Sequence, residues 1–80
     1  MRIMGIDPGL ATMGWGVIDC SLDAPEFVSS GIIQTLPAES LPQRLARIDS
    51  GMDELIMLYK PGAIVFEQLF FSKNVTTAFN

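Results

Sequence analysis

The chain has 80 residues, which is enough for one small domain of marginal stability. Its hydrophobic fraction of 49% and charged fraction of 18% are typical of a globular protein and not of a disordered one. No apolar run approaches the roughly 20 residues of a membrane span, and the N-terminus lacks the pattern of a secretory signal. We expect a cytoplasmic protein without an internal disulfide, because Cys20 is the single cysteine.

The charge balance and the lack of histidine narrow the chemistry. The net charge is −4, and this alone argues against nucleic-acid binding, because polyanion binders usually carry a basic surface. With no histidine in the chain, a general base would have to be a carboxylate, a lysine or a metal-bound water.

The N-terminal part of the chain predicts three consecutive strands. Residues 2–7 are apolar on both faces, as in a central strand, and Asp7-Pro8-Gly9-Leu10 predicts a type II turn. Residues 15–19 and 26–33 predict the second and third strands, separated by a polar loop. Because the links between these strands are short, we expect an antiparallel meander.

A helix is predicted to begin after Ser40, which forms a capping-box pattern with Gln43, and to end at Lys60-Pro61-Gly62. We expect Gly51 to allow close packing against a neighbouring backbone, and Arg44 and Arg47 to lie on a solvated face. The apolar residues recur at helical spacing and predict a single apolar face: Leu41, Leu45, Ile48, Met52, Leu55, Ile56 and Tyr59.

Two predicted strands end on an acid: residues 2–7 end on Asp7, and residues 63–67 end on Glu67. Strands joined by a crossover helix are usually parallel, so both acids should lie at the same edge of the sheet. A charge at the end of a buried strand loses hydration, and this is costly unless an opposite charge compensates it. The pair of acids therefore suggests a shared cation. Oxygen ligands suit Mg²⁺ or Mn²⁺, which makes a metal-dependent reaction the leading hypothesis. Asp19 should lie at the opposite edge, because its strand runs antiparallel.

Four segments of the chain match a known family pattern: Met4-Gly5-Ile6-Asp7-Pro8-Gly9, Gly14-Trp15-Gly16-Val17-Ile18, Leu41-Pro42-Gln43-Arg44-Leu45 and Phe66-Glu67-Gln68-Leu69-Phe70-Phe71-Ser72-Lys73-Asn74. Together they resemble the RuvC family of bacterial Holliday-junction resolvases. The resemblance spans essentially all 80 residues but only the N-terminal half of such a protein. It implies an α/β fold of the ribonuclease-H-like kind: a mixed sheet of three antiparallel strands, then a helix and a parallel fourth strand, with residues 1–80 as the N-terminal part of one nuclease domain.

The resemblance also implies a function. RuvC proteins are homodimeric crossover junction endodeoxyribonucleases, which cut four-way DNA junctions by metal-dependent phosphodiester hydrolysis in recombination and repair. They act with the branch-migration proteins RuvA and RuvB. Asp7 and Glu67 match two of the family's four metal-binding catalytic carboxylates. Phe70 matches an aromatic residue that contacts unpaired bases, and Lys73 and Asn74 match positions near the DNA.

The other two carboxylates of the family belong to a C-terminal helix that this sequence does not reach. We therefore expect the 80 residues alone to hold metal weakly, to bind DNA very weakly and not to cleave it. Residues 75–79, capped by Asn74, predict the opening of a further helix.

Three alternatives remain open at this point. The first is a nucleotide-binding module of the actin and sugar-kinase type, which also begins with a strand, an acid and a glycine-rich hairpin. Glu67-Gln68 followed by Phe70 argues against it, because that class does not call for these residues. The second is a non-catalytic relative, such as the branch that resembles the pre-16S ribosomal RNA nuclease. The third is an assembly fragment that gains stability by pairing through an uncovered sheet edge.

Overall fold

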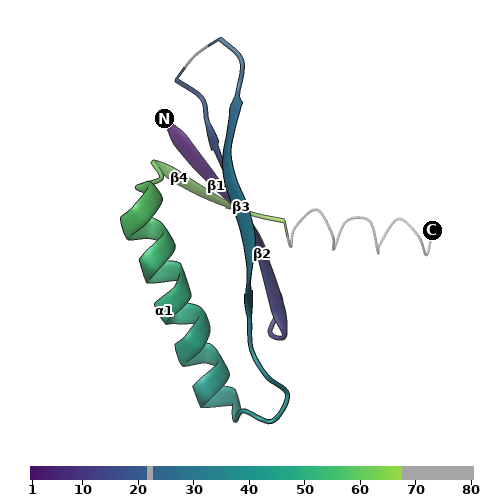
Figure 1. The fold of residues 1–80 in the computed structure, drawn as a ribbon. Helices are drawn as coiled ribbons and strands as arrows, with labels where there is room; N and C mark the ends of the chain where they lie inside the picture. Colours follow the sequence, from purple (N-terminus) through teal and green to yellow (C-terminus); the bar gives the residue numbers. More distant parts are fainter. Residues whose placement is uncertain (22, 68–80) are drawn as a thin grey trace, which may run out of the picture.

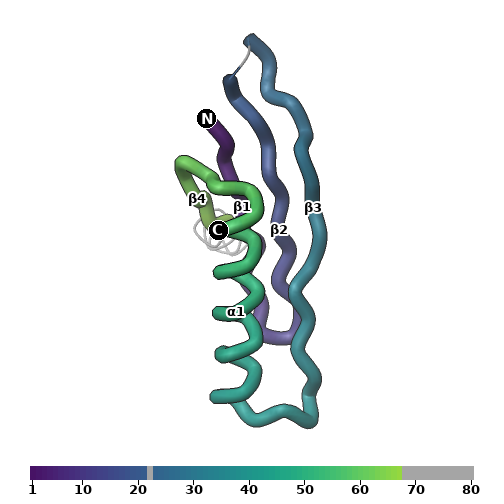
Figure 2. The backbone as a smooth tube through the Cα atoms, turned by 60° about the vertical axis from the view of Figure 1, so that its left-hand side comes forward, coloured from purple at the N-terminus to yellow at the C-terminus, as the bar shows by residue number. Residues whose placement is uncertain are grey.

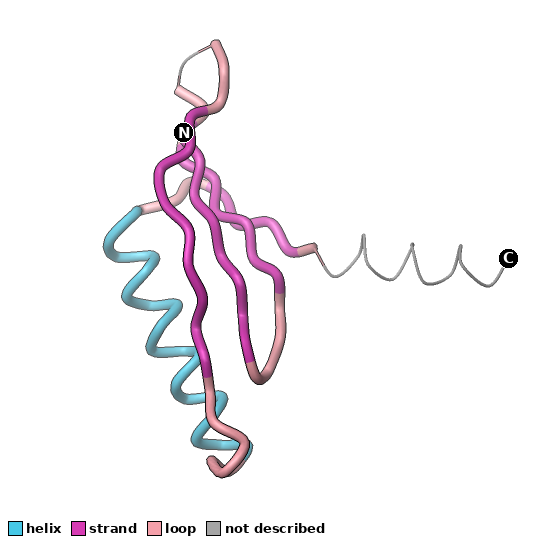
Figure 3. Tube along the Cα trace, turned by 45° about the vertical axis from the view of Figure 1, so that its right-hand side comes forward, coloured by secondary structure: helices cyan, strands magenta, loops and turns pink. Residues whose placement is uncertain are grey.

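The computed structural model describes residues 1–21 and 23–67 (Figure 1). A single sheet with the strand order β3-β2-β1-β4 carries helix α1 on one of its faces, as Figure 3 shows. The elements in chain order are β1 (Arg2–Asp7), β2 (Thr12–Asp19), β3 (Glu26–Gln34), α1 (Leu41–Tyr59) and β4 (Ala63–Phe66).

β1 is a central strand with a different kind of neighbour on each side. It pairs antiparallel with β2, where Asp7 faces Gly14, and parallel with β4, where Ile6 faces Phe66. β2 also pairs antiparallel with β3, with an irregularity between Val17 and Ile18. Figure 2 shows the strands side by side in this order. The predicted meander with a parallel fourth strand is therefore confirmed.

The segment between β1 and β2 differs from its prediction in two ways. β2 begins at Thr12 rather than at Trp15, because Thr12 and Met13 pair with β3 beyond the last residue of β1. The type II turn is wrong, because no glycine of the described residues has the positive φ that this turn requires. Gly9 is needed for space instead: a Cβ there would collide with the carbonyl oxygen of Thr12.

Helix α1 has the predicted ends. The Ser40 hydroxyl accepts a hydrogen bond from the Gln43 N–H at 3.3 Å, and the Gln43 side chain accepts one from the Ser40 N–H at 2.9 Å. This reciprocal pair is the predicted capping box. At the other end Lys60 adopts a left-handed conformation with φ of 50°, and its N–H donates to the Ile56 carbonyl at 2.9 Å.

The core lies between α1 and the sheet. Its fully buried residues come from β1 and β2 and include Met4, Ile6 and Val17. Trp15 and Tyr59 pack beside them with ring centroids 5.6 Å apart, which confirms that both are packing residues. Of the helix, the residues that pack on this core are Ile48, Met52, Leu55 and Tyr59.

The predicted single apolar face of α1 is only partly covered. Leu41, Leu45 and Ile56 are 55%, 52% and 38% exposed. Leu41 and Leu45 lie one heptad before Ile48 and Met52, on the same stripe of the helix, so they are exposed because the first turns of α1 do not pack on the core and not because they point elsewhere. Ile56 lies at the margin of this stripe. Gly51 allows close approach, as predicted, but to a side chain rather than a backbone: a Cβ there would lie 2.8 Å from Ile33 Cδ1. Within residues 1–21 and 23–67, no helix combines the length and apolar character needed to cross a membrane.

Candidate metal centre

Asp7 and Glu67 lie at the same rim of the sheet, as predicted. Asp7 is the last residue of β1, and Glu67 directly follows β4. The Glu67 N–H donates to the Ile6 carbonyl at 3.1 Å, so the parallel pairing continues for one residue past β4. Because paired residues of parallel strands project to the same face, the two carboxylates share a face as well as a rim.

Both acids line one open groove, whose volume is ≈ 620 Å³. The groove lies on the sheet face opposite to α1, because the residues of β1 that line it alternate with the buried Met4 and Ile6. Its floor is low, because the glycines of β1 and β2 that line it present only backbone there: Gly5, Gly14 and Gly16. The acids therefore stand at the end of a hollow that is open to a ligand.

The surroundings of the two acids differ from the expectation in one respect. Asp7 and Glu67 are exposed, so loss of hydration does not by itself demand a counter-charge. Within residues 1–21 and 23–67, no side chain forms a hydrogen bond or ion pair with either carboxylate. Neighbouring like charges across paired strands are unfavourable, and a bound cation would relieve this repulsion.

The donor set fits a hard divalent ion. Two carboxylates with free coordination positions around them suit Mg²⁺, which usually binds proteins through one or two carboxylates and keeps several waters. In the described part of the chain, no group of three or more His, Cys, Asp or Glu residues could hold a metal. The described residues therefore offer two carboxylates and no third protein ligand of these types.

Asp19 lies at the other end of the sheet, as predicted, where it pairs with Arg2. It accepts hydrogen bonds from the Ser21 hydroxyl and, at 2.9 Å, from the Ser21 N–H. These two bonds hold the pKa of Asp19 below its ordinary value. Asp19 thus organises the loop that follows β2 and has no part in the groove. Cys20 directly follows it as a half-buried free thiol.

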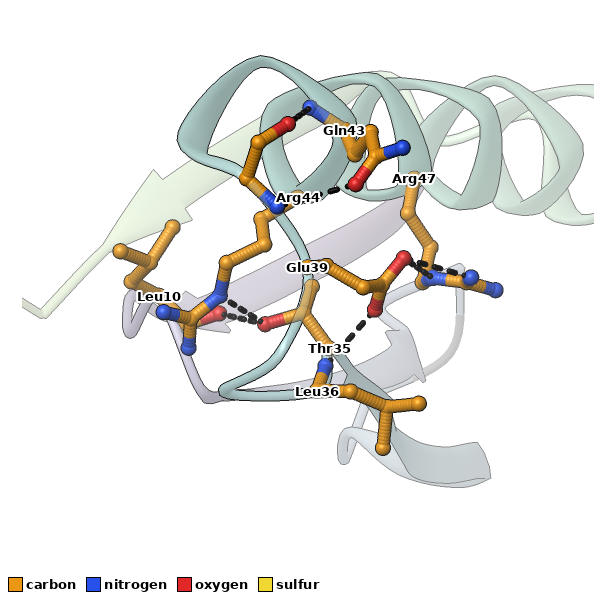
Figure 4. A network of polar contacts seen from close by, with 8 residues as sticks. Leu10, Thr35, Leu36, Glu39, Gln43, Arg44 and Arg47 are labelled. Carbon is orange, nitrogen blue, oxygen red and sulfur yellow. Dashed lines mark hydrogen bonds and ion pairs between the residues drawn. The ribbon is translucent and has the colours of Figure 1, made fainter.

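A second polar cluster lies beside the loop that follows Asp7 (Figure 4). The Thr35 hydroxyl donates to the Leu10 carbonyl at 2.6 Å, and Arg44 Nε donates to the Thr35 hydroxyl at 2.8 Å. The Thr35 N–H donates to the Ala11 carbonyl at 3.0 Å. Thr35 was missed by the sequence analysis, and the expectation that Arg44 lies on a solvated face is wrong. The only sequence signal is a threonine at a strand end followed, nine residues on, by an arginine in the first turns of a helix.

The neighbouring pair in Figure 4 joins Glu39 to Arg47 at 2.7 Å. Glu39 also accepts a hydrogen bond from the Leu36 N–H at 2.7 Å. The bond from Arg47, and then that from Leu36, lower the pKa of Glu39, while the carboxylate raises the pKa of Arg47. This pair steadies the link between β3 and α1. Phe70, Lys73, Asn74 and the predicted helix over residues 75–79 lie outside the described residues.

A mixed sheet of this order, with acids ending adjacent parallel strands, defines a ribonuclease-H-like fold with a candidate nuclease site. The family described as "Crossover junction endodeoxyribonuclease RuvC" matches residues 3–80. The chain therefore belongs to the RuvC family. This membership favours a nuclease over the nucleotide-binding alternative.

Individual relatives agree with the family match. The chain is 49% identical to RuvC of Rubrobacter xylanophilus, over 95% of this chain and 42% of that relative. It is 47% identical to RuvC of Brevibacillus brevis, over 99% of this chain and 48% of that relative. The chain thus spans somewhat less than half the length of these curated relatives.

Solved structures confirm the fold. T. thermophilus RuvC in complex with a Holliday junction substrate superposes with a TM-score of 0.76 at 29% identity, covering 82% of this chain and 41% of that one. A second Thermus thermophilus RuvC structure gives a TM-score of 0.74 at 26% identity. The fold class and the family implied by the sequence motifs are therefore both confirmed.

Proposed function

We propose that this chain belongs to a Holliday-junction endonuclease and supplies two of its metal-binding catalytic carboxylates, Asp7 and Glu67. The observation that carries the proposal is their placement: both end adjacent parallel strands and line one groove. Family membership supports it, because a similar structure contains RuvC bound to a junction substrate. The reaction would be hydrolysis of a DNA phosphodiester bond, as part of recombination and repair.

In this proposal Asp7 and Glu67 hold Mg²⁺ or Mn²⁺ through their carboxylate oxygens. The bound ion would supply electrostatic stabilisation of the charge on the phosphodiester that is cut. The glycine floor of the groove would allow a DNA backbone to approach the sheet closely, because Gly5, Gly14 and Gly16 put no side chain in its way. The exposure of both acids is compatible with a site that receives a large substrate.

Three further residues are proposed to contact DNA on the strength of the family resemblance. Phe70 would stack on unpaired bases near the junction, an interaction worth roughly 1–3 kcal/mol per base. Lys73 would contact a backbone phosphate, and Asn74 would lie close to the DNA. The net charge of the 80 residues is −4, so they carry little of the positive charge that DNA binding needs. We further propose a homodimer that acts with RuvA and RuvB in the cytoplasm.

Cleavage of a synthetic four-way junction by the full-length gene product tests this function. With Mg²⁺ present, Asp7→Asn and Glu67→Gln should each lower the cleavage rate by roughly 10³-fold, because a metal ion contributes several kcal/mol and each 1.36 kcal/mol is a factor of ten. Asp19→Asn is the matched control and should cleave normally, since Asp19 lies at the opposite end of the sheet. Normal cleavage by either site variant, or full activity without a divalent ion, would contradict the proposal.

A further inference from the structure

The loop that leaves Asp7 is held by a chain of hydrogen bonds that reaches helix α1, drawn in Figure 4. The Leu10 carbonyl accepts from the Thr35 hydroxyl, which in turn accepts from Arg44 Nε. Leu10, Thr35 and Arg44 are called the loop clamp below. The same threonine also holds the Ala11 carbonyl through its N–H. One residue at the end of β3 therefore fixes two consecutive carbonyl groups of this loop.

Thr35 is buried to an unusual degree for a polar residue. It is 5% exposed and is the one buried polar residue within residues 1–21 and 23–67. A buried hydroxyl is costly unless its hydrogen-bonding capacity is used, and here it both donates and accepts. Arg44 sits one turn inside a helix whose start is fixed by the Ser40 capping box. The clamp therefore connects the loop to a rigid element.

The loop clamp can affect the position of Asp7, because Asp7 lies where the pairing of β1 with β2 ends. The pairing of β1 with β2 ends at Asp7 and Gly14, so the residues that follow Asp7 receive no further support from β1. The loop is fastened at its start by Asp7 and at its far side by the loop clamp. If the clamp were released, the loop and the terminal residue of β1 could shift together relative to Glu67.

We infer that Thr35 and Arg44 are positioning residues for Asp7: through the loop clamp they hold the Asp7 carboxylate where it can share a cation with Glu67. This inference rests on the proposed function, because it takes Asp7 to be a metal ligand. Neither Thr35 nor Arg44 touches the substrate or the ion. Their effect passes through the backbone of Leu10 and Ala11.

Mn²⁺ binding to the full-length gene product, measured by titration calorimetry, tests the clamp. Thr35→Val keeps the shape but removes the hydroxyl and should weaken binding by about tenfold, as loss of groups that orient metal ligands typically does. Thr35→Ser retains the hydroxyl and should rescue binding. Arg44→Met should weaken binding in the same direction. Arg47→Met is the matched control, because Arg47 lies on the same helix but bonds Glu39 instead of the loop.

Amide hydrogen exchange supplies a second readout. Thr35→Val and Arg44→Met should each accelerate exchange at the N–H of residue 35, which donates to the Ala11 carbonyl, while the core residues of β1 remain protected. Mn²⁺ affinity that is unchanged in both folded Thr35→Val and Arg44→Met would overturn the inference. If Thr35→Val does not fold, Arg44→Met decides alone, because Arg44 is half-buried and outside the core cluster.

The clamp and the proposed function can fail separately. If Asp7→Asn binds Mn²⁺ as tightly as the wild type, Asp7 is not a ligand and the proposed function fails together with the clamp. If Asp7→Asn loses binding while Thr35→Val and Arg44→Met keep it, only the clamp is wrong.

Discussion

The two faces of the sheet are built from alternate residues of the same strands, yet one is buried under α1 and the other is an open groove. On the face covered by α1, β1 and β2 place large apolar side chains that are fully buried, such as Met4, Ile6 and Val17. On the opposite face these strands place glycines beside Ile3 and Ile18, and β1 ends there on Asp7. The alternation of side chains along a strand allows one segment to serve both stability and a binding site.

The glycines on the two faces also serve different purposes. A Cβ on Gly31 would lie 2.8 Å from the Trp15 ring, so this glycine makes room for packing under the helix. A Cβ on Gly5 would meet nothing within 4 Å, so this glycine leaves the groove empty. One face is shaped by close packing, and the other is shaped by keeping space free.

Truncation of a core side chain should have the largest effect on stability. Ile6→Ala should lower the free energy of unfolding by about 2–5 kcal/mol, because it removes a fully buried side chain from between sheet and helix. Val65→Ala, at a position 54% exposed in β4, should cost less than about 1 kcal/mol. Urea unfolding of the full-length gene product measures both. Equal costs would show that the two faces are not distinguished in the way described.

The next effect concerns the glycines. Gly31→Ala should destabilise the fold by about 1–3 kcal/mol, since the new methyl group would overlap the indole of Trp15. Gly5→Ala should change stability by less than about 0.5 kcal/mol, because its methyl group points into open space. Thermal unfolding of the two variants compares them directly. A larger loss in Gly5→Ala would mean that another part of the protein packs tightly against the groove floor.

The smallest expected effect is on the pH dependence of stability, through Glu39 in the link between β3 and α1. The pKa of Glu39 is lowered in the folded state by Arg47 and the Leu36 N–H, below its ordinary value of 4.5. Its contribution to stability is therefore present above pH 4.5 and is lost as the pH falls through the lowered pKa. Stability measured against pH should show a small acid loss that Glu39→Gln and Arg47→Gln each reduce, while the part due to Asp19 remains. An unchanged acid profile in Glu39→Gln would contradict this assignment.

Much of the fold could be predicted from local patterns. The apolar strand at residues 2–7 and the Ser40–Gln43 capping box are encoded in short segments, and the structure contains both. The meeting of Asp7 and Glu67 followed from one topological rule about crossover connections. The family motifs pointed to the same conclusion, because they place both acids at strand ends.

The rest depended on contacts between distant segments. The early start of β2 at Thr12 comes from pairing with β3, which the local sequence does not reveal. Arg44 resembles any exposed helical arginine until the link from β3 to α1 brings it to Thr35. Leu41 and Leu45 fit the helical spacing of the apolar residues, but spacing cannot tell how far along the helix the packing on the sheet will extend.

The central claim is that Asp7 and Glu67 share one divalent ion, and Mn²⁺ titration of the full-length gene product tests it most directly. The comparison needs the wild type, Asp7→Asn, Glu67→Gln and the double variant. Two ligands of one ion act as a unit, so each single variant should lose most of the affinity and the double variant should lose little more. Wild-type affinity in Glu67→Gln, or two losses that simply add, would show that the acids do not share an ion.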